Sequence, residues 1–418
     1  MRNSRRVVVT GLGVVAPNGI GKETFWQNLI AGKSGIDYIT AFDASAYPCR
    51  IAGQVQDFVA TDFMRGRTAK TTGRFTQLGL ASARLALDDA KLSISPTLSA
   101  QAFACFGNSA NGIGDIAADA IDGLTNRGVS AVKPWSALEF PPHAVASHLA
   151  IEFGIRGQAV TISSNCCTGL DAIETARAHI ASGHSTVALA GSGDAPIFPA
   201  SFSAFCALGA LSKRSDAPEK ASRPYDLLRD GLVISEGAAT LVLEDYDFAR
   251  DRGATIYAEV LGFQAGSEAI GMRKGDLSGK VMADAIRGAI ARSGLSLADI
   301  DYINAHGSSL ADYDICDSNA FKDALGKHAY HIPITSIKSM IGQPVSAAGT
   351  LQTASACMSL QTQCAPPTIN QEVPDPQCDL DYVPNLARVA RIKHVLINAH
   401  SFGGSVSALV IASPTRPN

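Results

Sequence analysis

Short apolar, β-branched runs alternate along this chain with longer, alanine-rich segments whose apolar positions recur at helical spacing. The runs that predict strands are 6–10, 103–106, 158–163 and 187–190, and the segments that predict helices are 73–91 and 169–182. Glycines punctuate this pattern, and we expect the first strand to end at Gly11 and the second helix to stop at Gly183. Strands that alternate with helices predict an α/β fold.

The same order of elements recurs in the second half of the chain. Residues 160–169 and residues 334–343 each consist of an apolar strand, a polar turn and the start of a helix. A further apolar strand follows each helix, and the second of these, 395–398, leads into a glycine-containing turn. The repeat indicates duplication, with a join near residue 255 and no flexible linker. The alternative, that any α/β protein shows such an order, stays open at this point.

Length and composition exclude several classes of protein. The chain has 418 residues, 46% of them hydrophobic, and a formal net charge of -3. A general nucleic-acid binder needs a clear excess of Lys and Arg, so we expect no nucleic-acid partner. No run approaches the roughly 20 apolar residues of a membrane span. The nine cysteines are scattered, which favours reduced thiols and a cytoplasmic protein.

Patterns for bound cofactors and metals are missing from the sequence. Gly11-Leu12-Gly13 follows a strand, but the dinucleotide-binding pattern is not completed at Ala16. The chain has no Walker lysine motif, and its histidines show no zinc-ligand spacing. We therefore expect no metal and no bound cofactor.

Cys166 is the first candidate for chemistry. It follows a predicted strand and a polar turn, and Ser164 or Asn165 could cap the helix that it opens. At the positive end of a helix dipole its pKa is expected to be lowered, which suits a nucleophile that forms thioesters. A buried structural cysteine is the alternative, and it is the role expected of Cys167, whose side chain points elsewhere.

His306 and Lys338 are candidates from the second half. His306 lies in a loop after a predicted strand, a common position for a catalytic residue, although a merely hydrogen-bonded histidine is the alternative. Lys338 lies in an apolar segment flanked by glycine. Instead of a surface charge, we expect a buried lysine with a carboxylate partner, for which Asp314 and Asp317 are the candidates.

The turn Phe402-Gly403-Gly404 follows the last apolar strand. Glycine turns of this kind expose backbone N–H groups that can bind an oxyanion. An ordinary connection between two strands is the alternative reading of this triplet.

Together these residues belong to a set of motifs that resembles the β-ketoacyl-acyl-carrier-protein synthases, in the elongating type II branch shared by fatty-acid and polyketide pathways. The likeness covers nearly the whole chain. The matching motifs are Val7-Val8-Val9-Thr10-Gly11-Leu12-Gly13, Asn165-Cys166 with Thr168-Gly169, Ser222-Arg223-Pro224-Tyr225-Asp226 with Asp230-Gly231 and Glu236-Gly237-Ala238, Asn304-Ala305-His306-Gly307, Lys338-Ser339-Met340-Ile341-Gly342 and Phe402-Gly403-Gly404.

The resemblance implies a duplicated, five-layered α/β/α/β/α thiolase fold with halves 1–255 and 256–418, usually as a dimer. It implies that no cofactor is bound, because substrates arrive on the 4'-phosphopantetheine arm of acyl carrier protein. Cys166 would take the acyl group. The N–H groups of Cys166 and Phe402 would form the oxyanion hole, and Phe402, beside Gly403, would gate the acyl pocket.

The resemblance also implies roles in decarboxylation. His306 and a second histidine would promote loss of carbon dioxide from malonyl carrier protein, and Lys338 would organise the charge around His306. The position of the second histidine holds Gln343 in this chain. An amide cannot carry a proton, but it can donate a hydrogen bond to an enolate oxygen.

Other positions also depart from the family pattern. Leu310 stands where a hydroxyl is usual, and Ser308 keeps a hydroxyl nearer the histidine for the pantetheine arm. Asp317 is the expected acidic partner of the motif lysine. His400 stands where an extra aromatic residue is frequent, so we expect it to support the site or the gate.

Three functions remain to be weighed. Decarboxylative Claisen condensation on carrier-protein thioesters leads. Acyl transfer without chain extension comes second, because acylation of Cys166 needs less machinery than decarboxylation. A chain-length-determining subunit of a ketosynthase heterodimer comes last, because such subunits usually lack the nucleophile. Homodimer and heterodimer both stay open.

Overall fold

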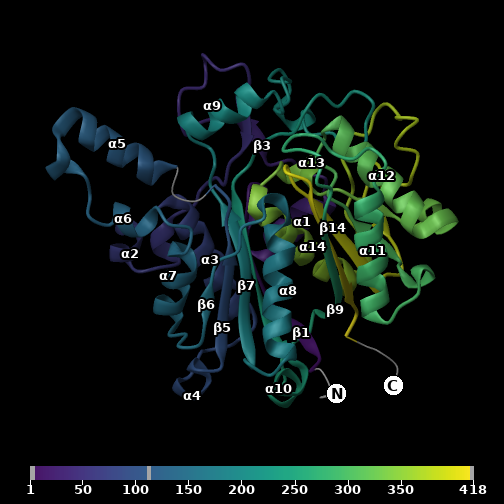
Figure 1. The fold of residues 1–418 in the computed structure, drawn as a ribbon, viewed down its shortest axis with the longest axis horizontal. Coiled ribbons are helices and arrows are strands. Elements are labelled where there is room, and N and C mark those ends of the chain that lie inside the picture. Colours follow the sequence, from purple (N-terminus) through teal and green to yellow (C-terminus); the bar gives the residue numbers. More distant parts are fainter. Residues whose placement is uncertain (1–4, 111–113, 415–418) are drawn as a thin grey trace.

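Two copies of one strand order build the structure, a computed structural model that describes residues 5–110 and 114–414 (Figure 1). The first copy contains β1 (Val7–Ala16), β2 (Gly19–Ile20), β5 (Ala102–Gly107), β6 (Ala159–Val160), β7 (Val187–Asp194) and β8 (Gly237–Asp245). The second contains β9 (Ala258–Ser267), β10 (Tyr302–Asn304), β11 (Ile334–Thr335), β14 (His394–His400) and β15 (Ser405–Ala412). Within the described residues these eleven strands form one sheet, in the order β11-β10-β14-β15-β9-β1-β8-β7-β5-β6, with β2 beside β1.

The two halves share their strand neighbours and directions. In the first half β8 pairs antiparallel with β1 and β7, and β5 lies parallel between β7 and β6. In the second half β15 pairs antiparallel with β9 and β14, and β10 lies parallel between β14 and β11. Antiparallel pairing of β1 with β9 joins them. This topology confirms the predicted duplication, while the join near residue 255 stays a prediction.

Helices form three layers around the strands. One apolar core packs α3 (Arg74–Asp89) and α7 (Ala144–Phe153) on the first half, and another packs α11 (Lys280–Ser293) and α12 (Ala311–Leu325) on the second. The third core surrounds the central helices α8 (Thr168–Ala181) and α14 (Ala348–Thr362). Figure 1 shows α3 and α7 on one side of the molecule and α11 and α12 on the other. The predicted α/β/α/β/α layering is therefore confirmed.

Smaller elements complete the chain. They are α1 (Lys22–Ile30), β3 (Ile36–Tyr38), β4 (Ile51–Gly53), α2 (Gly66–Thr71), α4 (Pro96–Ser99), α5 (Asp115–Arg127), α6 (Ser136–Glu139), α9 (Pro199–Leu208), α10 (Tyr246–Asp251), α13 (Lys338–Ile341), β12 (Cys364–Ala365) and β13 (Arg388–Val389). Short 3-10 turns precede both central helices, η4 (Asn165–Cys167) before α8 and η8 (Val345–Ala347) before α14. In the described part of the chain, the helices are all too short or too polar to cross a membrane.

Gly11 was wrongly expected to end β1. The strand continues through Gly11 and Gly13 to Ala16. A Cβ atom at Gly11 would lie 2.2 Å from the carbonyl oxygen of Ala86, and one at Gly13 would lie 1.8 Å from that of Ser82. Both carbonyls belong to α3, so these glycines allow α3 to pack closely against the strand instead of turning the chain.

The central helices α8 and α14 begin side by side, at equivalent places in the two halves. Gly169 is the second residue of α8 and Gly349 the second residue of α14. A Cβ atom at Gly169 would lie 2.6 Å from the nitrogen of Thr350, and one at Gly349 would lie 2.7 Å from the nitrogen of Leu170. This close approach brings the turn that carries Cys166 against the second half of the molecule.

Candidate active site

Loops from both halves enclose a small cavity beside the start of α8. Six of the predicted site residues line it, namely Cys166, His306, Ser308, Gln343, His400 and Phe402. Leu310 and Tyr313 also line it. The cavity has a volume of about 20 Å³, which is room for about one water molecule. An acyl chain can therefore enter only when part of the wall moves.

Cys166 is the middle residue of the three-residue turn η4 and is 6% exposed. Asn165 beside it has a φ of 57°, a left-handed conformation that asparagine tolerates better than most residues. Burial raises the pKa of the Cys166 thiol to about 12, while the charge of Lys338 acts in the opposite direction. The predicted lowering of this pKa is wrong, because desolvation outweighs the favourable charges around the sulfur.

Cys167 has the structural role predicted for it. Its N–H donates to the Oγ of Ser401 at 3.0 Å, and its sulfur contacts the carbonyl oxygens of Ala399 at 3.4 Å and Ser405 at 3.2 Å. These contacts join the turn of the first half to β14 and β15 of the second half, and they leave Cys166 as the cysteine that faces the cavity.

His306 is buried and held in one tautomer. Its Nδ1 accepts a hydrogen bond from the N–H of His400 at 3.3 Å, so the neutral ring carries its proton on Nε2. Its own N–H donates to the Oδ1 of Asn398 at 3.0 Å. Burial, with smaller effects from Lys338 and His400, lowers the pKa of His306 well below its usual value. The imidazole is therefore a neutral hydrogen-bond donor.

Lys338 is the first residue of α13, and its side chain donates a hydrogen bond to the backbone of His306. Its Nζ donates to the carbonyl oxygen of His306 at 2.5 Å and to the Oε1 of Gln352 at 3.3 Å. Burial lowers the pKa of Lys338 to about 8. The expected ion pair is absent, since no carboxylate of the described residues lies within 4.0 Å of Nζ. Sequence reasoning missed Gln352, whose only signal is a polar side chain inside the buried helix α14.

The two predicted carboxylates hold the loop that carries His306. Asp317 accepts the N–H of Gly307 at 2.8 Å, and its other oxygen accepts the Nδ2 of Asn398 at 2.8 Å. Asp314 accepts the N–H groups of Ser308 at 2.8 Å and Ser309 at 3.2 Å. Both carboxylates project from α12, so this helix fixes the loop of His306 through its N–H groups. Lys338 holds the same loop through the carbonyl oxygen of His306.

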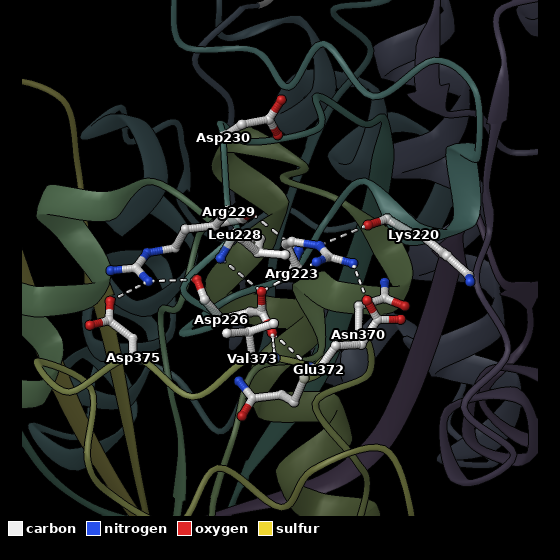
Figure 2. Close-up of polar contacts among 12 residues, drawn as sticks. Lys220, Arg223, Asp226, Leu228, Arg229, Asp230, Asn370, Glu372, Val373 and Asp375 are labelled. Carbon is white, nitrogen blue, oxygen red and sulfur yellow. Dashed lines mark hydrogen bonds and ion pairs between the residues drawn. The ribbon is translucent and has the colours of Figure 1, made fainter.

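A buried charge network supports that loop in turn (Figure 2). Arg223 pairs with Asp226 at 3.2 Å, and Arg229 pairs with Asp375 at 2.7 Å and with Asp314 at 3.4 Å. Figure 2 shows that Asp226 accepts hydrogen bonds from the backbone N–H groups of Glu372 and Val373, at 2.6 Å each. The arginine-containing motif is therefore structural. Besides Asp314, it contacts the cavity's supports where the hydroxyl of Tyr225 donates to Asp317 at 3.0 Å and the hydroxyl of Ser222 donates to the carbonyl oxygen of Lys338 at 2.7 Å.

Ser308 and Gln343 offer unused polar atoms to the cavity. The Oγ of Ser308 and the Oε1 of Gln343 form no hydrogen bond within the described residues, although the two residues are 1% and 4% exposed. Buried polar atoms usually have partners. These two atoms are therefore free to bind a substrate that enters the cavity.

A second hollow adjoins the cavity on the outside. It has a volume of about 260 Å³. It shares Leu310, Tyr313 and Phe402 with the inner cavity. The ring of Phe402 stands edge-on to that of Tyr313, with centroids 5.6 Å apart. Arg273 lies on the outer side. These three shared side chains form the wall between the hollow and Cys166.

Two backbone N–H groups of the glycine turn, those of Phe402 and Gly403, differ in whether they have an acceptor. The N–H of Gly403 donates to the carbonyl oxygen of Met272 at 2.8 Å, so Gly403 is not an oxyanion donor. Its place in the turn, with a φ of 93°, remains consistent with a gate. For the N–H of Phe402, no acceptor is found in the described part of the chain. This N–H is therefore available to an oxyanion.

Comparison with known proteins places this geometry in a family. The family sequence model described as beta-ketoacyl synthase, N-terminal domain, matches residues 4–249, and the one for the C-terminal domain matches residues 257–372. The 3-oxoacyl-[acyl-carrier-protein] synthase 2 of Coxiella burnetii is 38% identical, with 98% of both chains covered. The tetracenomycin polyketide synthase ketoacyl synthase alpha subunit of Streptomyces glaucescens is 39% identical, with 98% of this chain and 97% of the relative covered.

Solved structures agree in fold over the whole chain. A type II polyketide acyl-carrier protein in complex with its ketosynthase bound to the hexaketide matches with a TM-score of 0.91 at 35% identity, covering 99% of this chain and 100% of that one. The ishigamide ketosynthase/chain length factor matches with a TM-score of 0.92 at 31% identity, with the same coverage. The chain therefore belongs to the β-ketoacyl synthase family of thiolase-fold, acyl-transferring condensing enzymes.

Proposed function

We propose that this chain condenses an acyl group held on Cys166 with a malonyl group held on acyl carrier protein. The observation that carries this proposal is the shared cavity, in which a thiol of the first half and a neutral imidazole of the second half face one small space. The proposal applies to a site of the Cys-His-Gln type, with Cys166, His306 and Gln343 in direct contact with substrate and Lys338 as a positioning residue.

The first step is acyl transfer to the sulfur. The Cys166 thiol attacks the carbonyl carbon of an acyl thioester, the pantetheine sulfur leaves with the proton, and a new thioester forms on Cys166. Its carbonyl oxygen becomes negative in the tetrahedral intermediate. The N–H groups of Cys166 and Phe402 are the proposed donors to this oxygen, and each such donor typically contributes about 2.7–4 kcal/mol.

The second step forms the carbon–carbon bond. The malonyl group loses carbon dioxide, and the electron pair left behind is held as an enolate. Its carbon attacks the thioester carbonyl and the carbon–sulfur bond breaks. The leaving sulfur of Cys166 takes up one proton from solvent and becomes a thiol again. The Nε2–H of His306 donates to the enolate oxygen, because its Nδ1 is engaged with the backbone. The amide of Gln343 supplies the second hydrogen bond in place of a second imidazole.

Acyl carrier protein is the proposed partner, and its 4'-phosphopantetheine arm the proposed carrier. The outer hollow provides the route for the arm, and movement of Phe402 opens the wall to Cys166. The hydroxyl of Ser308, which has no partner in the described residues, is the proposed hydrogen-bonding group for the inner end of the arm. The nine free cysteines support a reducing, cytoplasmic setting.

The acylation step is tested by intact mass. Wild-type protein exposed to a panel of acyl carrier proteins should gain the mass of one acyl group, and Cys166→Ala should gain none. Cys357→Ala, which removes a buried cysteine inside α14, is the matched control and should still be acylated. Acylation that persists in Cys166→Ala would contradict the assignment of the nucleophile.

Acyl transfer without extension is the second candidate function. The amide at Gln343 favours it, because an amide cannot take up or release a proton. Transfer of an unextended acyl group from Cys166 to an amine or alcohol, with no loss of carbon dioxide, would establish this function instead.

We also propose that the chain is one half of a dimer. Figure 1 shows α5 standing out from the body beside α6. Apolar side chains on and next to these helices are exposed, with Ile121 62%, Leu124 51% and Leu138 69% accessible. An exposed apolar group of this kind is typical of a protein–protein interface. The partner can be a second copy or a related chain, as in the ketosynthase/chain length factor structure.

A further inference from the structure

A second cluster of reactive side chains lies beside the catalytic cavity, and the condensation proposed above uses none of its chemistry. Glu268 follows β9, Cys316 lies in α12, and His400 ends β14. All three are buried. One carboxylate oxygen, the thiol sulfur and one imidazole nitrogen all lie within 4.8 Å of one another. Three elements that are far apart in sequence thus bring three possible metal ligands together.

The imidazole of His400 is buried without a hydrogen-bond partner in the described residues. Its side chain is 0% exposed, yet neither ring nitrogen has a hydrogen-bond partner among the described residues. Its Nε2 lies 3.1 Å from the Oε1 of Glu268, but the two groups do not meet in hydrogen-bond geometry. A buried imidazole without partners is costly. A ligand placed between these side chains would remove that cost.

We propose that Glu268, Cys316 and His400 form a binding site for a divalent transition-metal ion of the zinc class. Zinc binds sulfur at about 2.3 Å, and imidazole nitrogen and carboxylate oxygen at about 2.0–2.2 Å, in tetrahedral geometry. Those lengths put neighbouring ligand atoms about 3.3–3.6 Å apart. The observed separations of 3.1 Å from nitrogen to oxygen and 4.0 Å from sulfur to oxygen lie close to these values.

The surroundings of the cluster support a metal ligand set. The second carboxylate oxygen of Glu268 accepts the N–H of Asp276 at 3.1 Å, which orients the group in the way that hydrogen bonds around metal sites commonly do. A metal that binds Cys316 has to displace the proton of its thiol. Three protein ligands leave a fourth position for water or another small ligand.

The site would brace the gate of the catalytic cavity. The N–H of Glu268 donates to the carbonyl oxygen of Gly404 at 2.8 Å, and the N–H of His400 donates to the Nδ1 of His306 at 3.3 Å. A metal bound to both side chains ties the segment after β9 to the glycine turn that carries Phe402. The inference stands on this geometry and does not require the condensation reaction.

Cobalt(II) substitution tests the site directly. The protein is treated with a chelator, dialysed, and titrated with Co²⁺, and then with Zn²⁺ as competitor. Bound metal is counted by mass spectrometry, and the thiolate-to-cobalt charge-transfer absorption reports a sulfur ligand. Because Cys166 and His306 could also capture a metal, the titration is repeated on Cys166→Ala.

The proposal predicts one metal ion per chain and a thiolate band in wild type, in Cys166→Ala and in the control Cys357→Ala. Cys316→Ala should lose the band and bind at least about tenfold more weakly, and His400→Phe should bind as weakly. Circular dichroism checks that each variant folds. A band that survives in Cys316→Ala but vanishes in Cys166→Ala, or the lack of saturable binding in wild type, overturns the proposal.

Discussion

Burial decides the ionisation of the three groups that surround the catalytic cavity. It raises the pKa of Cys166 to about 12, lowers that of Lys338 to about 8 and lowers that of His306 well below its usual value. At neutral pH the cavity is therefore lined by a thiol and a neutral imidazole, with one positive charge beside it. That combination suits a site in which hydrogen bonds to a developing oxyanion, and not a strong base, do the chemistry.

The buried lysine gives stability a defined pH dependence. Lys338 has a pKa of about 8 in the folded protein, whereas the ordinary pKa of 10.5 applies in the unfolded chain, so the unfolded chain binds more protons between these values. Its contribution to the free energy of unfolding should rise with pH in that window, by up to about 1.4 kcal/mol per pH unit, and stay flat below it.

Denaturant unfolding of wild type and Lys338→Met at several pH values checks this. The difference in unfolding free energy between the two proteins should move in favour of wild type from about pH 8 upward. A difference that does not change with pH would show that burial does not lower the pKa of Lys338 in the folded state.

Gln343 should matter for condensation and not for loading. Gln343 lines the cavity, and the N–H groups of its amide are the proposed donors to the enolate oxygen in the decarboxylation step alone. Gln343→Ala should therefore slow product formation by about 10²-fold, the usual effect of losing one oxyanion donor, and leave acylation of Cys166 nearly unchanged. Single-turnover assays of the two steps separate these effects, and an equal loss in both would contradict the assigned role.

The sequence identifies several site residues but not their environments. Cys166, His306 and Lys338 can be found from their motifs, and the structure places the first two in one cavity and the third beside it. The pKa of Cys166 and the partners of Lys338 could not be predicted, because desolvation depends on packing from both halves. The cluster of Glu268, Cys316 and His400 is invisible to spacing rules, because its members come from three separate elements.

At the scale of elements, α12 and residues 223–229 hold the loop of His306 through buried charges. Arg229 connects this network to Asp314, and Arg223 and Asp226 anchor it to the chain near residue 372. Buried pairs of this kind contribute little net stability while intact, but breaking one leaves an unpaired charge in the interior.

Asp226→Ala should therefore destabilise the protein by about 3–5 kcal/mol. Glu372→Ala is the matched control, because Glu372 pairs with the same Arg223 at 3.2 Å but its side chain is 50% exposed. Its loss should cost at most about 1 kcal/mol. Chemical denaturation of both variants measures the contrast, and equal costs would mean that burial does not set the strength of this network.

Element boundaries were predicted less well than element order. The alternation of strands and helices is right, but β1 runs past Gly11 to Ala16, and β6 covers only Ala159–Val160 of the six residues expected. Glycine was interpreted as a stop signal, whereas in β1 it makes room for α3. Only the three-dimensional packing distinguishes these two uses of glycine.

At the scale of the whole molecule, duplication explains how one cavity receives residues from distant parts of the sequence. Equivalent turns, η4 and η8, precede the two central helices, and the first of them carries Cys166. The second half contributes His306 and Gln343 to the same space. The proposed nucleophile and the groups proposed to stabilise the enolate thus come from different copies of one ancestral order of elements.

Assembly should depend on the projecting helix α5. We expect wild type to have the mass of a dimer by light scattering, either alone or after addition of a related chain. Replacing Ile121 and Leu124 by Asp places charges in the proposed interface, which should yield monomers with an unchanged circular dichroism spectrum. Ile151→Asp, at a 77% exposed position in α7, is the control. A dimer that persists in the α5 variant would show that the interface lies elsewhere on the molecule.

The central claim is that acyl-Cys166 reacts with malonyl carrier protein to form a new carbon–carbon bond. The most direct measurement loads Cys166 with one acyl group, adds malonyl carrier protein, and follows the mass of the carrier-bound product in a single turnover. Our account predicts a β-ketoacyl product two carbons longer than the loaded group, together with release of carbon dioxide and free Cys166. Acyl-Cys166 that persists unchanged, or that transfers its group without extension, would contradict it.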